Sequence, residues 1–167
     1  MPLRASRKRS RRRWGRLRGI WSRGTLWLLQ RNPPGITLTY RRYRGELAPV
    51  VPIQVKAGRR WKRVWAYVDS GAAYSILSVA EARRLGLMKV KARRMAIATS
   101  GGRTHQISLH RLWVKLAGEK LSITFGVPRG FNVDFNLLGR RDLFRRYVVS
   151  FDDHKGLLTF TRHHRDA

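Results

Sequence analysis

The stretch VWAYVDSGAAYSIL, residues 64–77, places a single carboxylate, Asp69, between two apolar runs. The four residues before it carry no charge, and no charge follows until Glu81, in a chain with nine acidic and 37 basic residues. An ionised carboxylate near a core is unfavourable unless hydrogen bonds or a shifted pKa compensate. Asp, Ser and Gly are also common turn residues, so a plain hairpin turn is the alternative interpretation.

Composition points to one folded domain with appended tails. The 167 residues are too few for two full domains, and a hydrophobic fraction of 43% is enough for a packed core. Because there is no cysteine, disulfides and thiolate metal ligands are excluded. The five histidines show no ligand spacing, and we expect neither a metal nor a cofactor.

The net charge of +28 is unevenly distributed along the chain. Residues 1–45 hold 14 basic residues and no acid, whereas residues 46–167 hold 23 basic and nine acidic residues. We therefore predict a disordered basic tail with Arg and Trp at 1–35, a folded domain at 36–162 and a short tail at 163–167. The turn sequence NPPG at 32–35 marks the first boundary.

Targeting signals are weak. No apolar run approaches the roughly 20 residues that span a bilayer. The basic stretch RKRSRRR precedes GIWSRGTLWLLQR, which Arg23 interrupts and which has no small-residue cleavage site. We expect a cytoplasmic protein without a transmembrane segment.

Several segments have the composition of strands. They are rich in β-branched residues and are bounded by turn residues. They comprise GITLTYRRY (35–43), APVVPIQVKA (48–57), VWAYV (64–68), AYSIL (73–77), KLSITFGVP (120–128) and the hairpin YVVSFDDHKGLLTF (147–160), whose turn is expected at 152–156. GRRWKR (58–63) is predicted to be a polar turn and NLLG (136–139) a buried turn.

Two short helices and one long hairpin complete the pattern. In SVAEARRLGL (78–87), Ser78 is an N-cap, Glu81 takes the capping-box position and Gly86 is a stop signal. RDLFRRY (141–147) is the second predicted helix. Residues 95–118 predict a hairpin with its tip at 100–103, and a change of hydrophobic phase at 110–111 suggests a β-bulge. The pattern predicts a mostly-β barrel or folded sheet.

Two motifs carry a family resemblance. DSGAAYSIL (69–77) resembles the D-[ST]-G-A-x-x-S-x-L signature of retropepsin-like aspartic proteases, and NLLGRRDLF (136–144) is similar to their Leu-Leu-Gly-Arg element. The order of strand, DSGA, helix, Gly-rich flap, strands, LLG and final strand also agrees over about residues 36–162. The resemblance implies a retropepsin-like closed β-barrel with a flap hairpin, active as a homodimer.

The resemblance also implies a chemistry. Each subunit contributes one catalytic residue, Asp69, and a two-fold dimer brings two copies together. Two carboxylates about 3 Å apart share one proton, so one activates water and the other protonates the substrate. The implied activity is that of an aspartic endopeptidase, which cleaves peptide or protein substrates without metal, cofactor or covalent intermediate.

Neighbouring residues acquire roles from the same resemblance. Ser70 would brace the two active-site loops across the dimer axis, the amide of Gly71 would approach the carboxylate, and Ala72 would pack beneath the loop. The flap tip over the substrate would comprise Ser100, Gly101 and Gly102, for which an ordinary Gly-Gly hairpin is the alternative. The structural turn behind the site would comprise Leu137, Leu138 and Gly139.

Two features depart from the family pattern. Two arginines precede Asp142, so we interpret this residue as a favourable charge near a helix N-terminus rather than an ion-pair partner. The flap has no obvious aromatic residue near its tip.

A different class of function is also open. The basic residues 1–32 could contact nucleic acid or another anionic surface non-specifically, with a β domain that is only structural. A third interpretation is a dimer that keeps the protease fold without cleaving, although the intact DSG argues against it.

Overall fold

The computed structural model describes residues 35–98 and 102–163. These residues belong to a unit that runs from Asn32 to Ala167. The predicted tails, 1–35 and 163–167, lie almost wholly outside the described residues, so their boundaries stay predictions. No helix within 35–98 and 102–163 is long and apolar enough to cross a membrane.

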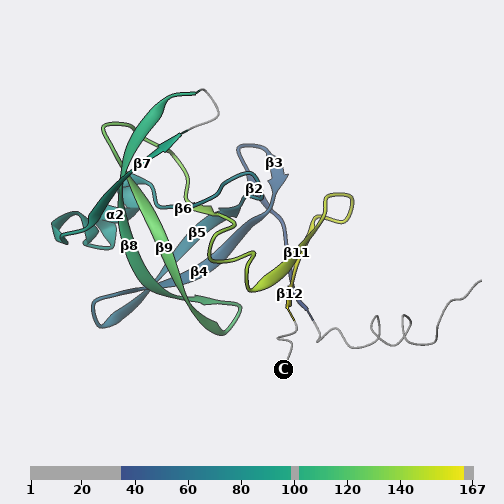
Figure 1. Ribbon diagram of the computed structural model, residues 1–167. Coiled ribbons are helices and arrows are strands. Elements are labelled where there is room, and N and C mark those ends of the chain that lie inside the picture. Colours follow the sequence, from purple (N-terminus) through teal and green to yellow (C-terminus); the bar gives the residue numbers. More distant parts are fainter. Residues whose placement is uncertain (1–34, 99–101, 164–167) are drawn as a thin grey trace, which may run out of the picture. The chain divides into compact units, whose positions relative to one another are not determined.

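Six strands form a closed ring, in the order β4-β5-β10-β6-β9-β8 with β8 pairing back to β4 (Figure 1). A further strand, β7, extends this sheet outside β8. The strands are β4 (Val50–Ala57), β5 (Arg60–Val68), β6 (Ser75–Ile76), β7 (Arg93–Ala98), β8 (Thr104–Leu116), β9 (Glu119–Arg129) and β10 (Leu137–Leu138). The predicted mostly-β barrel is therefore confirmed.

Antiparallel ladders close the barrel around its core. β4 pairs with β5 from Val50↔Tyr67 to Ala57↔Arg60, and with β8 from Ile53↔Leu116 to Val55↔Val114. The paired side chains on the inner faces are almost completely buried. This core includes Val51, Ile53, Val55, Val64, Val114, Leu116, Leu121, Ile123, Phe125, Leu138 and Leu143.

The predicted polar turn at 58–63 is wrong in extent. Only Gly58 and Arg59 form the turn, with Gly58 at a φ of +59°, and β5 begins at Arg60. Its first residues continue the ladder, because Trp61 pairs with Lys56 and Arg63 with Gln54. Charged residues are compatible with the strand here because Arg60 and Arg63 are exposed and Lys62 is only half-buried.

The predicted β-bulge at 110–111 is also wrong. β8 pairs with β9 in one unbroken register from Gln106↔Arg129 to Leu116↔Glu119. The hydrophobic phase changes because the first half of β8 buries one face of the strand and the second half buries the opposite face. Ile107 packs near Gly126 on one face, whereas Val114 and Leu116 lie in the barrel core on the other.

The first predicted helix is confirmed as α2 (Val79–Arg84), which is followed by a 3-10 helix, η1 (Leu87–Lys89). The Ser78 hydroxyl caps α2 by accepting a hydrogen bond of 3.1 Å from the backbone N–H of Glu81. Gly86 adopts the left-handed region, with a φ of +80°, and ends the helix as its position predicted.

The second predicted helix, at 141–147, is wrong. Residues 140–146 form successive turns. The amide of Phe144 bonds to the Arg140 carbonyl, and the amides of Arg146 and Tyr147 both bond to the Leu143 carbonyl, without a continuous helical ladder. The Asp142 carboxylate accepts a 2.8 Å hydrogen bond from the backbone N–H of Thr124. Asp142 thus links this segment to β9 instead of serving a helix N-terminus.

A second sheet consists of β1 (Ile36–Thr39), β12 (Leu157–Arg162) and β11 (Tyr147–Asp152), and β2 (Arg41–Tyr43) pairs separately with β3 (Glu46–Ala48). The predicted closing hairpin is confirmed as β11–β12. Glu119, at the start of β9, connects this sheet to the barrel. Its carboxylate accepts hydrogen bonds from the Arg162 guanidinium, at 2.9 and 3.0 Å from Nε, and from the Tyr147 hydroxyl.

This connection makes stability depend on pH. The hydrogen bonds from Arg162 lower the pKa of Glu119 below its usual value of 4.5. Ionised Glu119 therefore stabilises the fold above that pH, and the contribution is lost as the pH falls through the lower pKa of the folded state.

We expect Glu119→Gln to flatten the dependence of the unfolding free energy on pH below about 5. Denaturant titrations between pH 7 and 3 measure this, with exposed Glu46→Gln as the control; equal curves for both variants would contradict it.

Candidate active site

Asp69 lies immediately after β5, where β10 ends beside it. Its backbone N–H donates a 3.1 Å hydrogen bond to the Leu138 carbonyl, and Val68 donates one of 2.9 Å to the Pro49 carbonyl. The side chain is half-buried. The backbone at Asp69 is thus fixed by two neighbouring segments, and its side chain remains accessible.

The Asp69 carboxylate is held through one oxygen. The N–H groups of Gly71 and Ala72 donate to Oδ1 at 2.8 and 3.3 Å. Oδ2 makes no hydrogen bond to any of residues 35–98 and 102–163. A Cβ at Gly71 would lie 3.2 Å from Oδ1, a close contact, so glycine favours the approach of this amide. The arrangement orients one oxygen and leaves the other available.

Ser70 and Ala72 differ in exposure. Ser70 is exposed, and its hydroxyl makes no hydrogen bond within the described part of the chain. Ala72 is half-buried, and its carbonyl accepts a 2.9 Å hydrogen bond from the Arg140 N–H. The carbonyl of Ala73 accepts one of 3.0 Å from Arg141. Residues 140–141 therefore fasten the far end of the Asp69 loop.

The element predicted as a buried turn is a short strand, β10, which lies between β5 and β6. Leu137 and Leu138 pair in parallel with Tyr67 and Val68, and Leu137 pairs in antiparallel with Ile76. Leu138 is fully buried. β10 thus passes between the two strands that flank the Asp69 loop and supports the loop from behind.

Gly139 follows β10 at the tightest contact of the site. Its N–H donates a 3.0 Å hydrogen bond to the hydroxyl of buried Ser75. A Cβ at Gly139 would lie 2.5 Å from the backbone C and O atoms of Tyr74 and 2.9 Å from the Ala72 carbonyl oxygen. No larger residue fits without moving the backbone of the Asp69 loop.

Asn136 is a positioning residue that was not among the predicted site residues. Its side-chain amide donates to the Trp65 carbonyl at 2.9 Å and accepts from the Ser78 N–H at 2.9 Å. Its backbone carbonyl accepts from the Tyr67 N–H at 2.8 Å. It therefore joins β5 to the start of α2. The available signal was its position directly before LLG, where a polar residue adjoins a buried strand.

The hairpin β7–β8 occupies the place predicted for the flap. Its strands pair from Arg93↔Leu109 to Ala98↔Thr104 and extend beyond the ring of barrel strands (Figure 1). Gly102 has a φ of +70°. Ser100 and Gly101 lie outside the described residues, so their part in the tip stays a prediction.

An aromatic contact joins the hairpin to the segment after β9. The rings of His105 and Phe131 lie 4.3 Å apart, between centroids. The sequence showed no aromatic residue at the tip, and this contact lies instead near the start of β8. No group of three or more His, Cys, Asp or Glu within 35–98 and 102–163 could hold a metal ion.

Comparison with known families agrees with this geometry. Residues 47–152, more than half of the chain, match the family model described as aspartyl protease. The chain belongs to the aspartyl protease family, and the predicted retropepsin-like resemblance is confirmed.

The matches to individual relatives cover only part of this chain and a smaller part of each relative. The chain is 35% identical over 99 residues to DNA damage-inducible protein 1 of Phaeosphaeria nodorum, covering 58% of this chain and 22% of that one. It is 35% identical over 95 residues to Protein DDI1 homolog 1 of Homo sapiens, covering 56% and 24%. The chain therefore spans less than a quarter of the length of these relatives.

A solved structure agrees with the fold. The retropepsin-like aspartic protease from Rickettsia conorii superposes with a TM-score of 0.54 over 77% of this chain and 91% of that chain, at 24% sequence identity. At this identity the likeness describes the fold, which is a retropepsin-like barrel.

The contact at Gly139 generates a stability prediction. We expect Gly139→Ala to lower the unfolding free energy by about 3 kcal/mol or more, since its methyl group meets backbone atoms that cannot move aside. Gly58→Ala is the control. It has a positive φ but no atom within 4 Å, and we expect a loss of about 1 kcal/mol. Urea titration of both variants measures the difference, and equal losses would contradict the close approach.

Proposed function

We propose that this chain is an aspartic endopeptidase that hydrolyses peptide bonds between two Asp69 carboxylates at a homodimer interface. The observation that carries the proposal is the Asp69 carboxylate itself. Its Oδ1 accepts two backbone amides, while its Oδ2 makes no hydrogen bond within the described residues. A half-exposed carboxylate oriented in this way, in a chain of the aspartyl protease family, suits the activation of water.

One Asp69 is not enough for this reaction. A base must take a proton from the attacking water, and an acid must protonate the carbonyl oxygen and later the leaving nitrogen. No second carboxylate makes a hydrogen bond with Asp69 within residues 35–98 and 102–163, and the sequence has one DSG. A two-fold symmetric dimer places a second copy of the same residue at the same point. The second copy supplies the missing acid.

The proposed cycle balances its protons within the pair. Two carboxylates about 3 Å apart hold one proton between them. The ionised Asp69 takes a proton from water as the water oxygen attacks the peptide carbonyl, and the protonated partner gives its proton to the carbonyl oxygen. When the tetrahedral gem-diol intermediate collapses, the newly protonated carboxyl donates its proton to the leaving nitrogen, and the other carboxylate takes a proton from one hydroxyl of the intermediate as the new carboxyl group forms. The pair returns to one proton, without a covalent intermediate.

Other residues of the site would assist. Ser70, with an exposed hydroxyl, would donate across the dimer axis. Gly71 and Ala72 would keep Oδ1 oriented through their amides. The flap residues Ser100, Gly101 and Gly102 would cover a peptide substrate and exclude water. Leu137 and Leu138, in β10, and Gly139 after it would support the Asp69 loop from behind.

Asp69→Asn tests the proposal. The amide cannot act as the base, so we expect hydrolysis of a fluorogenic peptide library to fall roughly a thousandfold or more, with the fold and dimer intact. Hydrolysis in H₂¹⁸O should place ¹⁸O in the new carboxyl group, read by mass spectrometry. Asp152→Asn, at the end of β11 in the second sheet, is the matched control. Full activity of Asp69→Asn would exclude the assigned role.

Nucleic-acid binding stays an alternative prediction. Its support is charge alone: residues 35–98 and 102–163 carry 25 basic and eight acidic residues, and the most basic segment, residues 1–32, lies outside the described part of the chain. A non-specific basic contact is also compatible with the protease proposal. We therefore take it as an addition to proteolysis and not as the main function.

A further inference from the structure

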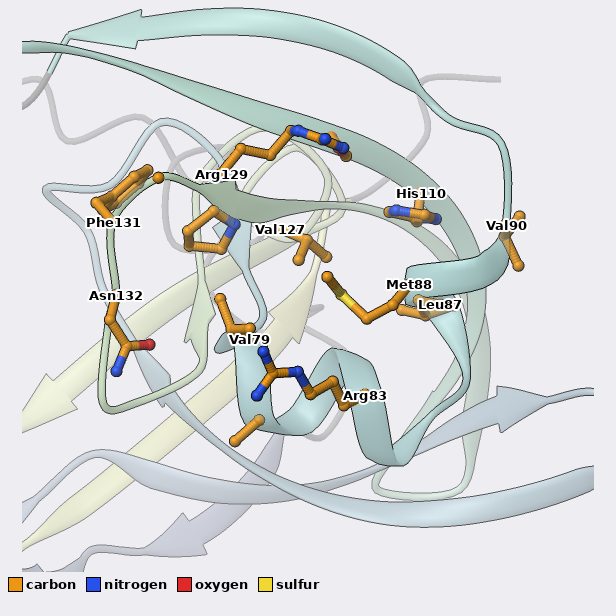
Figure 2. Close-up of a pocket in the computed structure, with 14 residues that line it drawn as sticks. Val79, Arg83, Leu87, Met88, Val90, His110, Val127, Arg129, Phe131 and Asn132 are labelled. Carbon is orange, nitrogen blue, oxygen red and sulfur yellow. The ribbon is translucent and has the colours of Figure 1, made fainter.

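A pocket of about 770 Å³ lies between α2, η1, β8 and the end of β9 (Figure 2). Asp69 is not among the residues that line it. The proposed hydrolysis therefore does not use this pocket. Its volume is within the range of about 300–1,000 Å³ that ligand pockets have.

The pocket has an apolar floor and an apolar rim. Val127 and Leu87 are almost completely buried at its base. Met88 and Val90, from η1 and the residue after it, are 50% and 56% exposed. Exposed apolar side chains beside a pocket are typical of a contact surface, and methionine adapts to irregular partners. This lining favours a ligand with an apolar group.

Two guanidinium groups line the same pocket. Arg83 projects from α2 and Arg129 from the end of β9, on opposite sides of the pocket in Figure 2. No acidic residue lines the pocket, and neither arginine forms an ion pair within residues 35–98 and 102–163. The Arg129 guanidinium donates a 3.3 Å hydrogen bond to the Ser108 hydroxyl, which holds it at the pocket. The charge favours a carboxylate on the ligand.

His110 adds a polar group without adding charge. It is buried in the wall of the pocket on β8, and burial lowers its pKa from 6.5. The imidazole is therefore neutral at neutral pH and can donate or accept a hydrogen bond. The positive charge of the pocket comes from the two arginines.

Charge and shape together select the occupant. The basic segment of this chain, residues 1–34, has eleven basic residues and no acid, so the arginines repel it. A nucleic acid would satisfy the arginines through its phosphates but would not use the apolar floor. We propose that the pocket binds a segment of another protein in which an acidic side chain lies beside an apolar one. The acidic group would bind Arg83 or Arg129, and the apolar group would bury Met88 and Val90.

The pocket also contacts the hairpin of the proposed flap. Phe131 lines the pocket and stacks on His105, while Ser108 and His110 belong to the same strand, β8. A bound segment would therefore touch the strand that carries the hairpin. Binding itself does not depend on hydrolysis, because no residue of the Asp69 loop takes part.

A peptide pair tests the proposal. The full chain would carry Asp69→Asn, which prevents cleavage. Fluorescence anisotropy would measure its affinity for a labelled peptide with alternating Glu and Leu. A twin with Gln for each Glu is the comparison. We expect at least about fivefold weaker binding of the twin, and about fivefold weaker binding of the acidic peptide by Arg83→Gln or by Arg129→Gln. Val90→Ser should weaken both peptides. Arg59→Gln, in the exposed β4–β5 turn, should change affinity less than twofold.

Four outcomes would overturn the proposal. Equal affinity for the two peptides would remove the role of charge, and an equal loss for Arg59→Gln would show a non-specific attraction. A statine-type inhibitor that displaces the peptide would place it in the cleft at position 69 instead. An RNA oligonucleotide with the same dependence on Arg83 and Arg129 would indicate a general anion site. Because cleavage is not measured, these results are independent of the protease proposal.

Discussion

The structure depends on the position of β10 between β5 and β6. Leu138 pairs with Val68 and its carbonyl accepts the N–H of Asp69, so the strand that precedes the carboxylate and the strand that supports it are fixed together. Gly139 then passes so close to Tyr74 that a single methyl group does not fit. The position of the Asp69 carboxylate is thus set by backbone contacts between segments about 70 residues apart in sequence.

This constraint explains how a lone carboxylate can lie next to the core. Asp69 follows a buried strand, but its own side chain is half-buried, with Oδ1 held by the amides of Gly71 and Ala72. Hydrogen bonds to one oxygen provide the compensation that burial requires. The other oxygen is left for a second group, and in the proposed dimer that group is the same residue of a second copy.

The sequence predicted the parts of the fold that local chemistry controls. The cap at Ser78, the stop at Gly86 and the alternating strands of the barrel follow from short patterns. The errors arose where distant contacts override local pattern. Residues 140–146 read as a helix but are fastened to Ala72, Ala73 and Thr124, and the phase change on β8 reflects burial of both faces. Asn136 and the pocket at Arg129 involve partners that no local pattern reveals.

Mixing active and inactive chains tests the central claim most directly. If two copies of Asp69 share one reaction, only dimers of two unmodified chains are active. An equal mixture of wild-type and Asp69→Asn chains, allowed to exchange at fixed total concentration, should then retain about one quarter of the wild-type activity. Retention of one half, proportional to the wild-type chain present, would show that each chain acts alone and would contradict the account.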